Sequence, residues 1–122
     1  MATAQAVTLT EKTYPTVKKI VWEWLCTDLG VVVSETTNTF DGVLQMVVFV
    51  PGGTTPTNAY DVTITDSNGL DILAGLGTDV SSSATVVKVH SDGLTAVSGE
   101  KIELNIANAG DAKNGTVVLY LR

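Results

Sequence analysis

The sequence predicts an all-β fold, an antiparallel two-sheet sandwich of jelly-roll-like form. Val and Thr each supply 18 of the 122 residues, and β-branched side chains suit a pleated, half-buried surface better than a helix. Alternating apolar and polar residues, clearest over residues 60–65, indicate strands with one buried face. Turn signals such as Asn68-Gly69 and Asn114-Gly115 recur at the short spacing of a sandwich or barrel.

Nine segments rich in β-branched or alternating residues are separated by Gly, Pro, Asn and Asp, and each is expected to be a strand. They are residues 7–12, 18–27, 30–36, 43–50, 60–65, 71–74, 85–91, 101–107 and 116–122. The cleanest alternating faces predict part of the core. Its expected members are Val62, Ile64, Ile102, Leu104, Ile106, Val117 and Leu119.

The chain has the length of one domain, which we place at residues 14–122 as a single β-sandwich. Residues 1–13 are mostly small and polar and alternate poorly. They precede Tyr14-Pro15, where proline interrupts a sheet ladder. We therefore expect residues 1–13 to form an extended N-terminal arm that contacts a neighbouring subunit, with Val7 and Leu9 in that contact.

Charge and hydropathy exclude several classes of function. A net charge of −6 and a pI near 4.4 oppose binding to nucleic acid or to an anionic membrane. The longest apolar run, residues 46–50, is far shorter than the roughly twenty residues of a membrane helix. The N-terminus lacks the pattern of a secretory signal, so we expect synthesis in the cytoplasm without export. Cys26 is the only cysteine, which excludes an internal disulfide.

Two strands predict a contact surface. In residues 43–50 both alternating sets are almost wholly apolar, so a strand there needs cover on both faces, from a partner subunit or from a loop of its own chain. Trp22 and Trp24 share one face of their strand, which indicates core or a subunit interface, or else an exposed platform for sugar rings. The expected interface residues are Trp22, Trp24, Leu44, Met46, Val48, Val50, Val7 and Leu9.

No pattern in the chain predicts catalysis, a cofactor or a metal. His90-Ser91-Asp92 holds the residue types of a serine triad, but three consecutive residues cannot converge on one another. The segment 66–71 imitates the opening of a calcium loop. Gly77 stands where an EF-hand needs its bidentate Glu, so the imitation is incomplete. We expect a protein that is not an enzyme.

Residues 58–77 read Asn-Ala-Tyr-Asp-Val-Thr-Ile-Thr-Asp-x-x-Gly-Leu-Asp-Ile-Leu-Ala-Gly-Leu-Gly, and the chain ends on Gly-Thr-Val-Val-Leu-Tyr-Leu-Arg. This pattern resembles one found in small virion structural proteins of tailed bacteriophages. The resemblance implies a capsid decoration or cement protein with a jelly-roll or sandwich fold. Such a protein would sit as a homodimer or trimer on the capsid exterior, bind the major capsid protein or other virion proteins, and cross-link neighbouring subunits.

Two alternatives stay open at this point. Related folds also serve as neck or tail components of the same particles. A carbohydrate-binding β-sandwich module that stacks sugars on Trp22 and Trp24 is the alternative from another class, and exposure of the two indoles would distinguish it.

Overall fold

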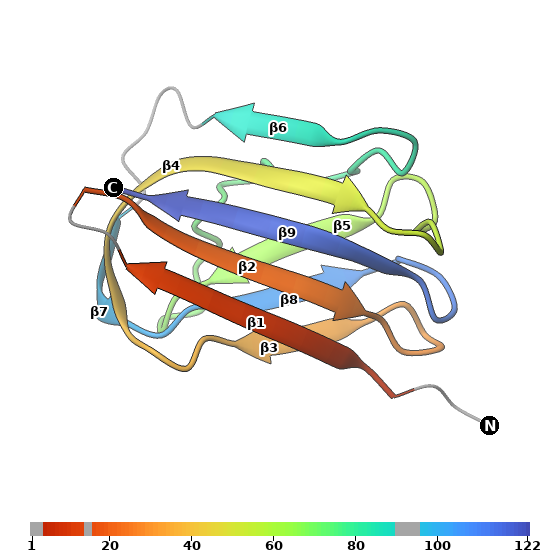
Figure 1. Ribbon diagram of the computed structural model, residues 1–122, viewed down its shortest axis with the longest axis horizontal. Helices are drawn as coiled ribbons and strands as arrows, with labels where there is room; N and C mark the ends of the chain where they lie inside the picture. Colours follow the sequence, from red (N-terminus) through yellow and green to blue (C-terminus); the bar gives the residue numbers. More distant parts are fainter. Residues whose placement is uncertain (1–3, 14–15, 90–95) are drawn as a thin grey trace.

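The strands form two antiparallel sheets packed face to face, which confirms the predicted β-sandwich (Figure 1). The structure is a computed structural model that describes residues 4–13, 16–89 and 96–122. The first sheet has the strand order β1-β2-β9-β4-β6, with β7 paired to the beginning of β4, and the second has the order β3-β8-β5. The strands are β1 (Ala6–Thr13), β2 (Lys18–Leu25), β3 (Val32–Glu35), β4 (Phe40–Pro51), β5 (Asp61–Thr65), β6 (Val86–Val89), β7 (Ala96–Glu100), β8 (Glu103–Ala107) and β9 (Asn114–Leu121).

Two elements differ from the sequence-based expectation. Residues 71–74 form a turn instead of a strand, because the Asp71 carboxylate accepts hydrogen bonds from the N–H groups of Leu73 and Gly75. Residues 96–100 form β7, although Ser98-Gly99 had the composition of a turn. Residues 90 and 91 of the expected strand 85–91, with the His90-Ser91-Asp92 segment, lie outside the described residues.

The core lies between the sheets and contains all seven residues that the alternating pattern predicted. Its largest members include Trp22 and Trp24 of β2 and Phe49 of β4. Tyr60 packs from the other layer, with its ring centroid 5.8 Å from that of Trp24 and the two rings inclined at 53°. These aromatic side chains fill the centre of the sandwich, so they contribute to stability and not to the surface.

The prediction of a separate N-terminal arm is wrong for residues 6–13. All eight residues of β1 pair with β2, and Val7 and Leu9 lie opposite Trp24 and Trp22. The two apolar side chains are half-buried against the core of their own chain. The alternation of residues 6–12 is weak because Thr and Ala occupy the outward positions, yet it has the period of a strand.

A β-bulge decides which side of β4 faces the core. The register against β9 shifts between Leu44 and Met46, so Leu44 points inward while Met46 points outward. Beyond the bulge Val47 and Phe49 are buried, and Val48 and Val50 alternate with them on the outer side. The apolar character of both faces therefore belongs to a central strand whose inner face is in the core and whose outer face is not covered by a described residue.

Candidate functional site

The face of the first sheet that points away from the core is the candidate site, and we call it the outer face. Strand register sets the order of its side chains, because residues directly opposite each other in a sheet share one face. One row across the five strands reads Thr10, Val21, Val118, Val48 and Val87. The row is polar at the β1 end and apolar over the other four strands.

The neighbouring row has the same gradient. It reads Lys12, Lys19, Tyr120, Met46 and Val89, from β1 to β6. At its centre the Lys19 Nζ lies 5.8 Å from the centroid of the Tyr120 ring, a cation–π arrangement.

Together the rows form a continuous apolar surface, which we call the outer patch. Its side chains are half-exposed in the centre of the sheet and more exposed on β6, where Val87 and Val89 are 55% and 58% accessible. A contiguous apolar surface of this kind indicates a contact site for another macromolecule. The outer patch consists of Val21, Met46, Val48, Val50, Val87, Val89, Val118 and Tyr120.

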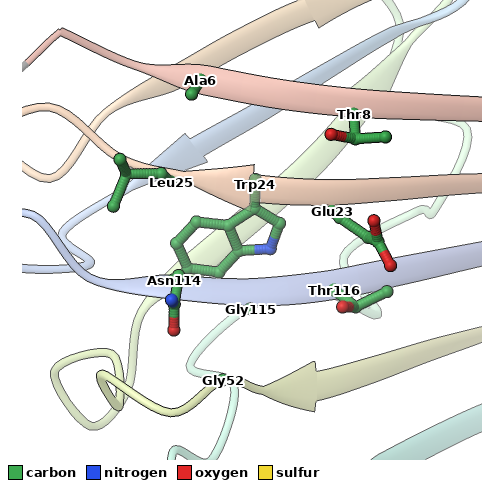
Figure 2. Close-up of a pocket in the computed structure, with 9 residues that line it drawn as sticks. All are labelled: Ala6, Thr8, Glu23, Trp24, Leu25, Gly52, Asn114, Gly115 and Thr116. Atoms are coloured by element: carbon green, nitrogen blue, oxygen red, sulfur yellow. The ribbon is translucent and has the colours of Figure 1, made fainter.

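An open hollow of about 380 Å³ adjoins the outer patch on the same face (Figure 2). Thr8, Glu23 and Thr116 form the row that crosses it, since they lie opposite one another on β1, β2 and β9. Ala6, Leu25, Asn114 and Gly52 surround its other end. Glu23 is exposed and is the one charged residue among those that line the hollow, so the hollow suits a basic side chain of a partner.

The structure brings only part of the predicted interface to this surface. Met46, Val48 and Val50 are half-exposed members of the outer patch. Trp22, Trp24 and Leu44 are at most 3% accessible, so the prediction that they contact a partner is wrong. Val7 and Leu9 are half-buried against their own core, and their contact with a neighbouring subunit stays a prediction.

Sequence reasoning missed five members of the outer patch. Val21 and Val118 alternate with core residues in β2 and β9, and Tyr120 does so as well, so the period of two contained a signal for them. Val87 and Val89 were not recognised because β6 is short and its pairing with β4 fixes which side chains point outward. That pairing is long-range and leaves no mark in the local sequence.

The buried polar groups of the core do not form a chemical site. The indole N–H groups of Trp22 and Trp24 and the Tyr60 hydroxyl have no hydrogen-bond partner among the described residues. Burial raises the pKa of Tyr60 to about 12, because the phenolate would lose its hydration. The Cys26 thiol is enclosed as well, with its Sγ 3.2 Å from the Gly110 carbonyl oxygen and 3.1 Å from the Lys113 nitrogen.

The segment that imitates a calcium loop forms a hydrogen-bonded turn. Asp66 Oδ1 accepts from the N–H groups of Asn68 and Leu70, at 2.9 and 3.0 Å. Asp71 Oδ1 accepts from Ile64 N–H at 3.1 Å, and its other oxygen is bonded to the following turn. Within residues 4–13, 16–89 and 96–122, no three His, Cys, Asp or Glu side chains gather in a way that could hold a metal ion.

No family model, curated protein or solved structure matches the chain. In the part of the chain that the structure describes, no helix has the length and apolar character to cross a membrane. The outer face is therefore the feature from which a function is inferred.

Proposed function

We propose that this chain is a non-enzymatic structural protein of a tailed-bacteriophage virion, a capsid decoration protein. It is made in the host cytoplasm, docks on the exterior of the shell through its outer face and cross-links neighbouring capsid subunits. The observation that carries the docking role is the outer patch, an apolar surface across four strands of a chain whose core is complete without it. The resemblance of residues 58–77 and of the C-terminal strand to virion proteins supports the type of particle.

The outer face also favours a defined kind of partner surface. Val48 and Val118 offer apolar area at its centre, while Glu23 offers a negative charge in the adjoining hollow. A complementary surface presents apolar side chains next to a Lys or Arg that enters the hollow. Since copies on a shell are held at high local concentration, modest affinity at each contact suffices to reinforce the particle.

Burial of Trp22 and Trp24 opposes the alternative of a sugar-binding module that uses them. Both indoles are buried, at 0% and 2% accessibility, so neither offers a face on which a sugar ring can stack. A role in the neck or tail of the particle would use the same outer face. It differs from capsid decoration in copy number.

A mass-spectrometric inventory of virions from a phage that encodes the chain tests the proposal. We expect the chain in purified particles at a copy number that follows the symmetry of the shell. A low copy number of about ten would indicate the neck or tail instead and overturn the capsid assignment. Absence from the particles would overturn the virion role altogether.

Two lysine substitutions in one row of the outer face test the docking surface. Val48→Lys puts a charge into the outer patch, whereas Thr10→Lys puts the same charge on the same face outside it. We expect Val48→Lys to lower the number of copies per virion at least about tenfold, because a charge in a desolvated contact is costly. Thr10→Lys should bind as the unaltered chain does. Equal incorporation of both folded variants would show that another surface docks.

A further inference from the structure

We propose that two copies of this chain pair through the free edge of β6, so that the first sheets of both copies join into one continuous antiparallel sheet. The occupant of the edge is the β6 strand of a second copy, related by a two-fold axis. This inference concerns the isolated chain and does not depend on the virion assignment.

The main-chain groups on the outer edge of β6 have no partner strand among the described residues. In an antiparallel strand the main-chain groups of successive residues point alternately to the two sides. Gly52 N–H donates to the Asn114 carbonyl of β9 at 3.0 Å, so the main-chain groups of Phe49, three residues earlier, point the other way, toward β6. Phe49 lies opposite Val86, which therefore faces β4. The N–H and C=O groups of Val87 and Val89 consequently point away from β4. Within the described residues β6 is the last strand of its sheet, as Figure 1 shows, and nothing pairs with this side.

The edges of the second sheet are closed by the chain itself. On β3, Val33 N–H donates to Gln5 Oε1 at 2.9 Å, and Gln5 Nε2 donates to the Val33 carbonyl at 2.7 Å. On β5, Ile64 N–H donates to the Asp71 carboxylate and Val62 N–H donates to the Gly77 carbonyl. The outward main-chain groups of Val33 on β3 and of Ile64 and Val62 on β5 are therefore occupied, and a strand added at either edge would have to displace these bonds.

The opposite edge of the first sheet, β1, is unsuited to self-pairing. Its outward side chains are Ala6, Thr8, Thr10 and Lys12, so a strand added there would extend a polar surface. At β6 the outward side chains are Val87 and Val89, which continue the outer patch. Addition of a strand at β6 therefore covers exposed apolar area, and addition at β1 does not.

One register suits a two-fold pair of β6 strands. Opposite residues must share a face, and the edge-facing residues must meet one another, which leaves two registers that each pair three of the four residues of β6. In one, Val87 lies opposite Val87 of the second copy, and Val86 lies opposite Lys88. In the other, the two Lys88 side chains lie directly opposite, which is unfavourable for like charges. Lys88 thereby selects the valine-centred register.

Pairing in this register closes at two copies. The β6 edge of each copy is paired with that of the other, so neither edge remains open for a third copy and the contact does not propagate into a fibre. The outer patches of the two copies meet at the axis, where the two Val87 side chains lie opposite each other and each Val89 lies diagonally across from Val87 of the other copy. The two patches then form one apolar surface of twice the extent. The contact is continuous with the outer face on which the proposed docking relies.

Sedimentation of the purified chain over a range of concentrations, with Val87→Pro and Val87→Thr beside it, tests the pairing. Proline removes an N–H that points to the free side, so the fold tolerates it while strand addition is blocked. We expect a monomer–dimer equilibrium whose dissociation constant rises at least about tenfold in Val87→Pro. Val87→Thr keeps the N–H and the β-branch and should dimerise. Circular dichroism verifies that each variant is folded.

A cysteine cross-link tests the register and does not require the proline variant to fold. Directly opposite residues that exchange main-chain hydrogen bonds lie about 5.5 Å apart between Cα atoms, within the range of a disulfide. Oxidation of Val87→Cys should give a covalent dimer. Val33→Cys is the matched control, since Val33 also lies in an edge strand and is 47% accessible, but its edge is closed. The native Cys26 is buried.

Each remaining outcome decides against the proposal. It is overturned if the chain sediments as a monomer up to millimolar concentration, or if Val87→Cys cross-links no faster than Val33→Cys. A trimer, or a dimer that folded Val87→Pro leaves intact, would place the contact elsewhere. A chain that stays monomeric and binds only an extended strand of another protein would show that the edge has a different occupant.

Discussion

Val33 and Val87 occupy equivalent places in the two sheets, but only the main-chain groups of Val33 are hydrogen-bonded by another part of the described chain. Each lies in a four-residue edge strand, exposes about half of its side chain and turns its main-chain groups away from its neighbouring strand. At Val33 the amide of Gln5 supplies both an acceptor and a donor for those groups. At Val87 the described chain supplies neither. The fold thus closes one short edge and leaves the other available.

The side-chain hydrogen bonds of Gln5 and Glu11, which we call the seam, explain how the β3 edge is closed. Gln5 directly precedes β1 and Glu11 lies near its end; the Gln5 side chain bonds to β3, and the Glu11 side chain bonds to the residues that follow β3. Glu11 accepts a hydrogen bond from Thr37 N–H at 2.7 Å and is also bonded to the Asn38 amide. The N-terminal strand therefore joins the two layers as well as extending the first sheet. The β6 side of the sandwich has no such connection among the described residues.

Removing the seam should have the largest effect on folding. Deletion of residues 2–12 removes nearly all of β1, including the half-buried Val7 and Leu9. It also removes the hydrogen bonds made by the Gln5 and Glu11 side chains. We expect a loss of at least about 3 kcal/mol in the free energy of unfolding, because burial of one such side chain contributes about 1.5–3 kcal/mol when complete. Urea unfolding measures the change. A melting curve equal to that of the full chain would mean that the seam is not part of the domain.

Opening the β5 edge should have the next largest effect. Asp71→Ala removes an acceptor for the N–H groups of Ile64, Leu73 and Gly75, of which the first two are partly buried. Hydrogen bonds to a charged group contribute about 1.5–3 kcal/mol, so we expect a loss of about 2 kcal/mol in thermal or urea unfolding.

Asp28→Ala is the control for this variant. Asp28 is exposed in a turn, and none of the described residues is hydrogen-bonded to its side chain, so its removal should change stability by less than about 0.5 kcal/mol. If both variants lost the same stability, the effect would come from the aspartate charge and not from the closed edge.

Opening the β3 edge should leave the main-chain groups of Val33 unpaired, as those of Val87 are within the described residues. Gln5→Ala leaves the N–H and C=O of Val33 without their partner. We expect a loss of about 1 kcal/mol, the usual net contribution of such hydrogen bonds. The informative measurement is the cross-link. The double variant Gln5→Ala, Val33→Cys should form covalent dimers faster than Val33→Cys alone, and an unchanged rate would show that an open edge is not sufficient for pairing.

The sequence predicted the core and the fold class but not this difference between edges. Val62, Ile64 and Leu104 follow the period of two, and local alternation is enough to assign them to the interior. Which strands lie at an edge depends on pairing between residues far apart in the chain, as in the contact of Gln5 with Val33 across 28 positions. Local pattern contains no record of such pairs.

The errors in the candidate site have the same origin. Trp22 and Trp24 were assigned to an interface because a large apolar residue fits both a core and a contact surface. The packing of the second sheet against this face of β2 places both indoles inside. The apolar outer side of β4 was recognised from sequence. Its neighbours on β6 became visible once the register placed Val87 opposite Val48.

The smallest effect on folding is expected at the centre of the open edge, from Lys88→Val. Lys88 is exposed, so its replacement should change the free energy of unfolding by less than about 0.5 kcal/mol. Association should change more for two reasons. Removal of the Lys88–Lys88 repulsion admits the second register. The substitution also leaves an exposed edge strand in which all four residues, 86–89, are valine. We expect larger and less uniform species in sedimentation than the dimer of the unaltered chain. If folded Lys88→Val stayed a uniform dimer at the same concentrations, Lys88 would not be the residue that sets the register.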